Sequence, residues 1–489
     1  MLNPKLLQTV QKHLTYFAVQ NAFRSLSKKF GEINLVKSAS LRWQLRRTAF
    51  LVIPKIAEPS SRTKKTSVGT NLTIVNQFFP PDYAATGQLI EELAYELNGN
   101  FDRVEVFTGQ PAYAFQRDNL PQWENNQGLS IRRSKSVSFG YGRIRGKALS
   151  GFIFFLQTAL YLLGHASRRQ LVLLTTAPPF LPLLGYFVNL FCKMPYICLL
   201  YDLYPDVAIE LNVIPKNHWL TKFWDFCNYL TWKKASAIIV LSSTMKDRII
   251  KKCPRIADKI VVIHNWSDSK KIKPIPKADN WFAQEYNLVD QFTVMYSGNM
   301  GRCHDMNTLL DAMIILRNTQ IQFVFIGGGD KLKYLKSQVA KLNLTTCSFL
   351  PYQTKENLPF SLTACDVSIV SIDEKMDGLV APSKLYSALA AGTPIAAICP
   401  KHSYLKNLLA NANCGETFIN GDSAGLATYL EKLSQNPQLV KKLGKSGREY
   451  CLEHYTLKKI AQDYLKLAEI VYRNQLRSFR RSNKIDVTT

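Results

Sequence analysis

Short apolar runs alternate along the chain with segments in which apolar residues recur at helical spacing. Runs such as 71–75 and 171–175 are typical of strands buried on both faces of a parallel sheet. After the first run, Ile90, Leu93 and Leu97 fall on one face of a predicted helix. Alternating strands and helices predict an α/β fold with parallel sheets. Strands are predicted at 71–75, 103–108, 171–175, 196–201, 237–241, 260–263, 293–297, 323–326 and 367–372.

The pattern divides the chain into two halves of the same type, each Rossmann-like. A Lys- and Pro-rich stretch at 268–280 separates them and is predicted to be the interdomain linker. A final helix is predicted near 456–474. The predicted organisation is a basic extension at 1–70, a first domain at 71–270 completed by 456–476, a second domain at 271–455, and a basic tail at 477–489.

Two uncharged stretches, 148–164 and 171–192, are long enough to raise the question of a membrane span. The second contains Pro178, Pro179 and Pro182, which favour a strand, a turn and then a helix. The first is predicted to be a helix that is buried or lies at an interface, with a membrane span as the alternative.

The second half contains three strand–turn–helix units whose turns either contain glycine or lead into a helix N-terminus that could bind phosphate. Their turns are 297–301, 327–329 and 377–384. Glycine allows a tight turn and a close approach of the backbone to a ligand. In a parallel sheet the three turns share one rim, where helix N-termini attract phosphate. Lys384 opens the third helix, with Ser383 as its predicted N-cap.

Five segments together resemble the retaining GT-B glycosyltransferases of family 4, and the branch that builds lipid-linked bacterial surface polysaccharides in particular. The resemblance implies two Rossmann-like domains facing across a cleft, with the C-terminal helix crossing back to the first domain. It covers roughly residues 71–476. The segments are 78–87, 201–206, 263–266, 296–301 and 382–386.

The resemblance implies a nucleotide-diphosphate sugar as donor, held by the second domain. Lys384 and Arg302 would stabilise charge that grows on the diphosphate as it leaves. Tyr352, in the loop after residue 350, would contact the base, although it could equally be a packed aromatic. The remaining predicted donor contacts are Ser297, Gly298, Asn299, Gly301, Gly328, Pro382, Ser383 and Ser387.

One position departs from the family pattern of two glutamates eight residues apart. Ser387 stands where the second glutamate, the ribose ligand, is expected, and Leu379 stands at the first. A hydroxyl binds a ribose more weakly than a carboxylate does. The donor's identity is therefore left open, and a catalytically degenerate copy remains an alternative.

In the first domain, Gly87 precedes a helix and is predicted to approach the donor phosphate or the acceptor. Asp202 ends an apolar strand, so its carboxylate is predicted to face the cleft and contact the acceptor hydroxyl or the sugar. A structural turn aspartate is the alternative. His264 and Asn265, at another strand end, are predicted to form a hinge or an interdomain contact.

The charge balance predicts polyanionic neighbours. The formal net charge is +26, and residues 1–70 hold thirteen Lys and Arg against Glu32 and Glu58. This extension is interpreted as lying on an anionic membrane or as a solvated arm; an organelle transit peptide is an alternative. Ten scattered cysteines without a C-x-x-C pair favour reduced thiols.

Several other chemistries lack their motifs. No Asp-x-Asp metal clamp, Walker A loop, Gly-x-Ser-x-Gly elbow or His-Glu-x-x-His occurs. No metal site and no cofactor besides the donor are predicted. The alternatives are a nucleotide-sugar 2-epimerase of the same fold and a non-catalytic membrane- or nucleic-acid-binding protein.

The predicted function is transfer of a hexose or N-acetylhexosamine from a nucleotide sugar to a lipid-linked saccharide, with nucleic acid not expected as a partner. The charge and the aromatic-rich helix at 148–164 motivate the lipid-linked acceptor. The predicted location is cytoplasmic, peripheral at the inner face of the cell membrane, in contact with anionic lipid.

Overall fold

The computed structural model describes residues 68–485, apart from Tyr83, residues 112–119 and 136–143, Ala166 and Arg168. The prediction for the basic extension therefore lies outside the described residues, apart from residues 68–70. The end of the tail, residues 486–489, lies outside them as well.

The first half forms a sheet in which eight described strands lie in the order β3-β4-β2-β1-β5-β6-β7-β8. All neighbouring pairs are parallel except β3 and β4, which form a hairpin that the apolar pattern did not predict. Its turn is marked by Gln127 and Gly128, both at positive φ. The strands are β1 (Asn71–Val75), β2 (Arg103–Thr108), β3 (Trp123–Asn126), β4 (Leu129–Arg133), β5 (Gln170–Thr175), β6 (Tyr196–Leu200), β7 (Ala237–Val240) and β8 (Ile260–Val262).

Helices cover this sheet because each buries one apolar stripe on it. In α3 the predicted residues Ile90, Leu93, Ala94 and Leu97 are buried, which confirms that helix face. The helices are α3 (Ala85–Leu97), α4 (Ile144–Gly164), α5 (Leu183–Cys192), α6 (Asp206–Glu210), α7 (Trp219–Lys234) and α8 (Ser243–Lys252), with a short 3-10 helix η1 (Pro254–Lys259).

Helix α4 corresponds to the uncharged stretch 148–164. One side of it packs on β2, where the ring of Tyr161 stacks on Phe107 at 4.2 Å and Phe154 contacts the same ring. Searched over the described residues, the structure holds no helix with the length and apolar character needed to cross a membrane.

The second half forms a sheet whose six described strands are all parallel, in the order β11-β10-β9-β12-β13-β14. The strands are β9 (Thr293–Ser297), β10 (Gln322–Ile326), β11 (Cys347–Leu350), β12 (Val367–Ser371), β13 (Ile395–Ile398) and β14 (Gly415–Phe418). The helices are α9 (Trp281–Glu285), α10 (Asn307–Ile315), α11 (Leu332–Lys341), α12 (Leu358–Thr363), α13 (Lys384–Ala391), α14 (Tyr404–Ala412), α15 (Ser423–Ser434) and α16 (Pro437–His454), with 3-10 helices η2 (Lys277–Asp279) and η3 (Glu374–Met376).

Both sheets reverse their strand order at one place. The reversal lies between β1 and β5 in the first sheet and between β9 and β12 in the second. Loops on either side of a reversal run in opposite directions and leave a crevice at the carboxyl ends of the strands, which is where open α/β sheets bind ligands. The fold therefore places one candidate crevice in each domain.

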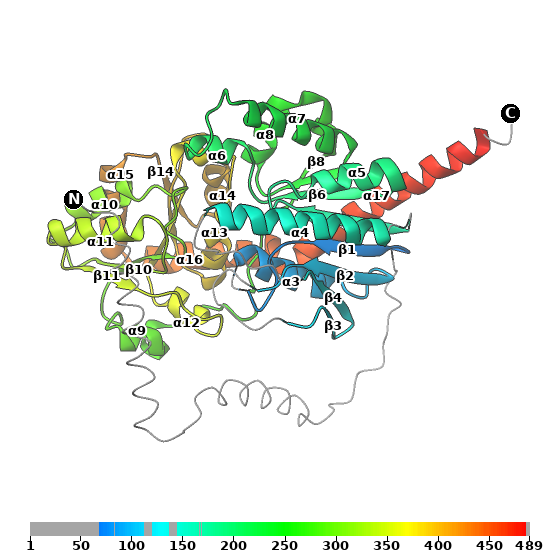
Figure 1. Cartoon of the computed structure of the whole chain (residues 1–489). Coiled ribbons are helices and arrows are strands. Elements are labelled where there is room, and N and C mark those ends of the chain that lie inside the picture. Colours follow the sequence, from blue (N-terminus) through cyan, green and yellow to red (C-terminus); the bar gives the residue numbers. More distant parts are fainter. Residues whose placement is uncertain are drawn as a thin grey trace, which may run out of the picture. The chain divides into compact units, whose positions relative to one another are not determined.

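The C-terminal helix α17 (Leu457–Ile485) returns to the first domain and packs on α3 (Figure 1). Its Tyr464 and Val471 are buried in the core that contains the strands of the first sheet. The predicted helix is confirmed and is longer than expected. The linker is tied to α16, because Arg448 donates hydrogen bonds of 2.7 Å to the carbonyls of Ile272 and Ser269.

All ten cysteines lie in the described residues, and their thiols are free. Seven are buried and three are partly buried, as the scattered spacing predicted.

Candidate active site

The turns that follow β9 and β10 are hydrogen-bonded to each other. The Gly298 N–H donates to the Ile326 carbonyl at 2.8 Å, and the Met300 N–H donates to the Gly328 carbonyl at 2.6 Å. Gly298 has φ of 128°, which an L side chain rarely adopts. Two of the predicted phosphate turns therefore form one surface at the rim of the second sheet.

The ring of Tyr352 lies against this surface. A Cβ atom on Gly328 would be 3.0 Å from Tyr352 Cε2, and one on Gly327 would be 3.2 Å from Cε1. The Tyr352 side chain is 61 % exposed, so it is not a packed core aromatic. Its position beside the glycine turns leaves an aromatic face on the rim.

Lys384 reaches the same place from α13. A Cβ atom on Gly298 would be 2.8 Å from its Cε and 3.4 Å from its Nζ. The Nζ lies 5.0 Å from the centre of the Tyr296 ring, and no carboxylate of the described residues lies within ion-pair distance of it. Burial lowers the pKa of the Lys384 amine to about 8. Gly298, Gly328 and Lys384 thus converge, as the sequence predicted.

His304 lies within electrostatic range of Lys384 and was not predicted from the sequence. Its Nδ1 lies 2.7 Å from the Ser371 carbonyl, which can only accept, so Nδ1 carries the proton. Burial, followed by the charge of Lys384, lowers the pKa of His304 to about 3. The imidazole therefore stays neutral and adds no positive charge beside the lysine.

Asp202 follows β6 in the first domain and is partly buried. Burial raises the pKa of its carboxyl to about 6. In the second domain, the Cys303 thiol lies within electrostatic range of both Asp202 and Lys384. Burial, then the carboxylates of Asp202 and Asp373, raise the pKa of that thiol to about 11. The predicted carboxylate and ammonium therefore border one region.

The Arg302 side chain contacts the first domain. Its guanidinium donates to the carbonyl of Leu211 in the first domain, and the side chain is exposed. In this structure Arg302 joins the two domains. A diphosphate would have to draw it away from that carbonyl before it could serve as a donor contact.

The start of α13 differs from the prediction in its cap. Ser383 directly precedes the helix, but it has helical φ and ψ and its side chain makes no capping bond. The first turn is tightened instead, with Tyr386 N–H donating to the Ser383 carbonyl at 3.2 Å. The prediction of a side-chain cap is therefore wrong. Ser383 is exposed, and Pro382 before it is buried.

Four further predicted residues are placed as follows. The Ser387 hydroxyl donates to the Lys384 carbonyl at 3.0 Å, one turn into α13. Ser297 ends β9, and the Asn299 carbonyl accepts from the Tyr296 hydroxyl at 2.8 Å. A Cβ atom on Gly301 would be 2.9 Å from the Asn299 side chain. All four lie in or next to the turns already described.

Gly87 is explained by packing within the chain. A Cβ atom there would be 3.0 Å from the carbonyl of Phe78. The turn that precedes α3 folds closely over this position, and Gly87 is buried. The glycine is needed for that close approach whether or not a ligand binds.

The loop that precedes α13 in the second domain also touches the first domain. Leu203 N–H donates to the Leu379 carbonyl at 2.9 Å, and Arg248 donates to the Asp377 carbonyl at 3.2 Å. His264 Nδ1 lies 3.1 Å from the Tyr386 hydroxyl, which confirms the predicted interdomain contact. The segment that leads into Lys384 therefore also carries contacts between the two domains.

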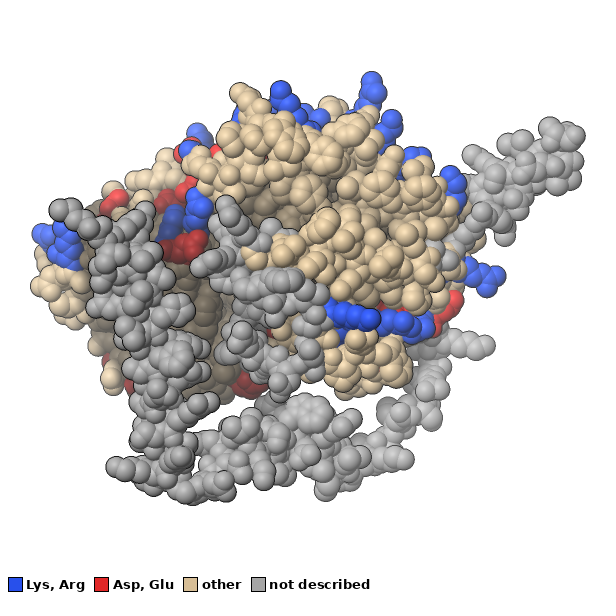
Figure 2. All heavy atoms as spheres, in the orientation of Figure 1, with Lys and Arg blue, Asp and Glu red and all other residues tan. Residues whose placement is uncertain are grey.

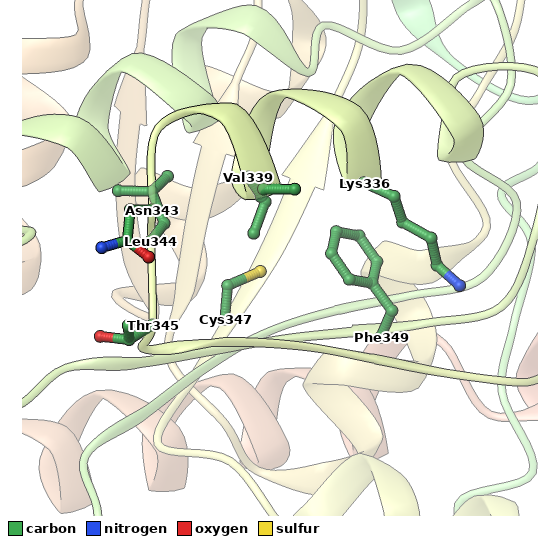
Figure 3. Close-up of a pocket in the computed structure, with 8 residues that line it drawn as sticks. Lys336, Val339, Asn343, Leu344, Thr345, Cys347 and Phe349 are labelled. Atoms are coloured by element: carbon green, nitrogen blue, oxygen red, sulfur yellow. The ribbon is translucent and has the colours of Figure 1, made fainter.

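A separate hollow lies between α11 and the edge strand β11 (Figure 3). Lys336 and Val339 of α11 and Cys347 and Phe349 of β11 line it. Its residues precede the carboxyl end of β11, whereas the converging turns follow the strand ends. It is therefore distinct from the candidate site.

Family comparisons match this two-domain arrangement. Residues 278–450 match the family Glycosyl transferases group 1, and residues 85–266 match the Glycosyl transferase 4-like domain. This chain is a glycosyltransferase. The match at 278–450 contains the second crevice, so the convergence of Lys384 with the glycine turns falls within the group 1 domain.

Two relatives in sequence carry glycosyltransferase names. The glycosyltransferase shares 26 % identity over 302 residues with the Pseudomonas aeruginosa protein named glycosyltransferase WbjE, which is 60 % of this chain and 73 % of that one. It shares 26 % identity over 157 residues with Escherichia coli WcaI, named for colanic acid biosynthesis, which is 32 % of this chain and 38 % of WcaI.

Solved structures confirm the GT-B fold. Sucrose-phosphate synthase from Thermosynechococcus elongatus superposes with a TM-score of 0.66 at 17 % identity, covering 84 % of this glycosyltransferase and all of that chain. Anabaena HepE, solved with UDP and glucose, superposes with a TM-score of 0.60 at 16 % identity, covering 81 % and 98 %.

Proposed function

We propose that this glycosyltransferase transfers a sugar, with retention and without a metal ion, from a nucleotide-diphosphate sugar to a lipid-linked saccharide in polysaccharide synthesis. The observation that carries the donor assignment is the partly buried Lys384 side chain, whose amine lies beside Gly298 with no carboxylate partner in the described residues. A partly buried ammonium without a carboxylate partner is costly unless an anion binds there. A diphosphate supplies that anion, and HepE, a protein of the same fold, was solved with UDP.

The donor would lie along the rim of the second sheet. Lys384 and the backbone around Gly298 would hold the diphosphate, and the exposed ring of Tyr352 would stack on the base. As the bond between the sugar C1 and the diphosphate oxygen breaks, its electron pair stays on that oxygen. Lys384 then stabilises more charge in the transition state than in the bound donor, which accelerates the reaction.

The acceptor would enter from the first domain. The Asp202 carboxylate would accept a hydrogen bond from the acceptor hydroxyl and orient its oxygen toward C1. In a transfer with retention, that oxygen forms its bond on the face from which the diphosphate departs. The hydroxyl proton then passes to the departing diphosphate oxygen, so charge and protons balance. The name of WcaI, a relative in colanic acid biosynthesis, supports a saccharide acceptor.

The test is a thermal-shift screen of nucleotide sugars, followed by turnover with the best donor. In Lys384→Met, we expect the donor-induced shift to disappear and kcat/KM to fall about 10²- to 10³-fold. Lys336→Met, which removes an exposed lysine over Phe349, is the matched control and is expected to keep both. Unchanged turnover in Lys384→Met would remove it from the site. Conversion of the donor alone into another sugar would instead identify a 2-epimerase.

A further inference from the structure

Helix α4 exposes a stripe of large apolar side chains. Leu149, Phe152, Leu156, Leu160 and Leu163 follow one another at spacings of three and four residues, so they lie on one helix face. Phe152 is 58 % exposed and Leu160 is 73 % exposed. The opposite side of the helix is already satisfied by its packing on β2. This outward stripe is therefore not needed to hold α4 on the sheet.

Helix α5 lies beside α4 and extends the stripe. Its Phe187, Leu190 and Phe191 are also exposed, and Phe191 is 70 % exposed. We call Phe152, Leu156, Leu160 and Leu163 of α4, together with Phe187 and Phe191 of α5, the apolar face. Figure 2 shows a broad tan area over these two helices, with blue Lys and Arg atoms mostly toward its margins.

A continuous apolar face of this kind needs a partner. Single exposed apolar residues are common on proteins, but patches that join two helices mark an interaction site. Helix α7, which packs on α5, adds the exposed Trp219 and Phe223. Residues 148–164 of α4 contain no charged side chain that would keep the stripe in water.

The charge around the face selects the kind of partner. Residues 125–201, which include α4 and α5, contain nine Lys and Arg and not one Asp or Glu. Of these, Arg132 and Arg133 pair with Glu105 and Glu124, whereas Arg169 and Lys193 are exposed just beyond the C-terminal ends of α4 and α5. An apolar surface with positive charge at its edge is complementary to an anionic bilayer. A second copy of the chain fits less well, because two proteins of net charge +26 repel each other.

The position of the face relates it to the acceptor crevice. Helices α4 and α5 both begin at the carboxyl-end rim of the first sheet, since they follow β4 and β5. Gly151 in the first turns of α4 lies against Pro178 in the turn after β5, with 3.3 Å between an added Cβ and the proline Cβ. Asp202 follows β6, the neighbour of β5. The face therefore starts at the rim that carries Asp202.

We propose that the apolar face is the surface on which this enzyme docks to an anionic lipid bilayer, so that a lipid-anchored acceptor reaches the rim at Asp202. This proposal depends on the proposed function only in taking the acceptor to be lipid-anchored. Phe152, Leu160 and Phe191 would enter the boundary between headgroups and acyl chains, while the surrounding Lys and Arg contact the headgroups.

The experiment is cosedimentation of the full chain with vesicles of equal parts phosphatidylglycerol and phosphatidylcholine, against vesicles of phosphatidylcholine alone. The face variant is Phe152→Gln with Leu160→Gln and Phe191→Gln. We expect its partition onto the anionic vesicles to fall about 30-fold. The matched control is Ile315→Gln with Ile419→Gln and Leu452→Gln, three exposed apolar residues of the second domain, and is expected to bind as the parent does.

The face variant retains the basic extension, so equal binding by variant and parent would show that the extension alone carries the contact and would overturn the proposal. Self-association that is lost in the face variant, with vesicle binding unchanged, would overturn it in favour of a second copy. Donor-induced thermal shifts are expected to be the same in all variants, because Lys384 is untouched. If the donor assignment were wrong, the donor-induced thermal shift would be absent from the parent as well, whatever the result with vesicles.

A second measurement tests the proposal without removing apolar side chains from the face. In Phe191→Trp, vesicles that contain brominated phosphatidylglycerol are expected to quench the added tryptophan fluorescence, because position 191 would lie at the acyl boundary. Absence of quenching while the protein sediments with the vesicles would place another surface on the lipid and contradict the proposal.

Discussion

The rims of the two sheets have the same topology but opposite backbone chemistry. In the second domain the turns after β9 and β10 contain Gly298, Gly327 and Gly329, all at positive φ. In the first domain the turns after β1 and β5 contain proline pairs, Pro80–Pro81 and Pro178–Pro179. Glycine leaves an N–H and room for a ligand, whereas proline has no N–H and fixes its backbone.

The two rims also carry side chains of opposite charge. The second rim carries the Lys384 ammonium, suited to a diphosphate. The first carries the Asp202 carboxylate, suited to a sugar hydroxyl. Since both rims are crevices at a reversal of strand order, the fold determines where ligands bind, and the residues at the turns determine which ligand each crevice takes.

After the loss of Lys384, the largest expected effect is at the first rim. Asp202→Asn is expected to lower kcat/KM about 100-fold, because the amide cannot hold the acceptor hydroxyl as an anion does. The dependence of kcat/KM on pH gives the sharper test. Asp202 is ionised above its pKa of about 6, so kcat/KM rises through that pH. Lys384 loses its proton above its pKa of about 8, so kcat/KM falls there.

Initial-rate measurements from pH 5 to pH 9 would check both limbs. In Asp202→Asn the acid limb is expected to vanish while the alkaline limb stays. An acid limb that persists in this variant would assign it to another group and would break the pairing of carboxylate and ammonium across the two rims.

The next effect tests the second rim. In Gly298→Ala, the added methyl group would lie 2.8 Å from Lys384 Cε, and the backbone would be strained at φ of 128°. We expect about a 30-fold loss of kcat/KM, since displacing the lysine removes part of its stabilisation of the diphosphate. The control is Gly99→Ala, which also has positive φ but has open space around it.

Gly99→Ala is expected to cost about 1 kcal/mol of folding stability and to leave kcat/KM unchanged. Thermal unfolding and initial rates together separate strain from displacement of the lysine. Equal losses of activity in the two variants would mean that strain alone explains Gly298.

A smaller effect is expected at the base contact. Tyr352→Ala is expected to raise the KM for the donor about 10-fold with little change in kcat, because stacking holds donor and transition state alike. Tyr352→Phe keeps the aromatic face and should behave as the parent enzyme does. If the phenylalanine variant also loses affinity, the hydroxyl rather than the ring makes the contact.

The smallest effect is expected at the position that departs from the family pattern. The Ser387 hydroxyl bonds to the Lys384 carbonyl within its own helix, so Ser387→Ala should change the donor KM by about 3-fold or less. Donor titrations would measure this change. A loss of more than about 30-fold, which exceeds a neutral hydrogen bond, would establish Ser387 as the ribose ligand.

Features of the candidate site could be predicted from the sequence where a local backbone conformation or position strongly favours one residue type. The glycines after β9 and β10 were recognised because a turn at positive φ favours glycine, and Lys384 because it begins a helix after a buried strand. The Ser383 cap was predicted wrongly, because a tightened first turn keeps Ser383 in helical geometry and its side chain away from the N–H groups.

Other site residues gave no local signal. Cys303 and His304 follow Arg302 in an irregular turn, and only packing brings them under Lys384 and toward Asp202. The hydrogen bond of Arg302 to the Leu211 carbonyl of the other domain also had no signal in the sequence. The β3–β4 hairpin was also missed, since its exposed strand β3 has no apolar repeat.

The sequence by itself determined the alternation of buried strands and amphipathic helices, the two domains and the glycine turns, because burial and backbone geometry act over a few neighbouring residues. The tertiary structure alone decided which strands lie side by side, that Asp202 and Lys384 border one region, and that the stripes of α4 and α5 join into one face. Those relations depend on chain segments tens to hundreds of residues apart, whose positions are set by the packing of the whole core and not by local preference.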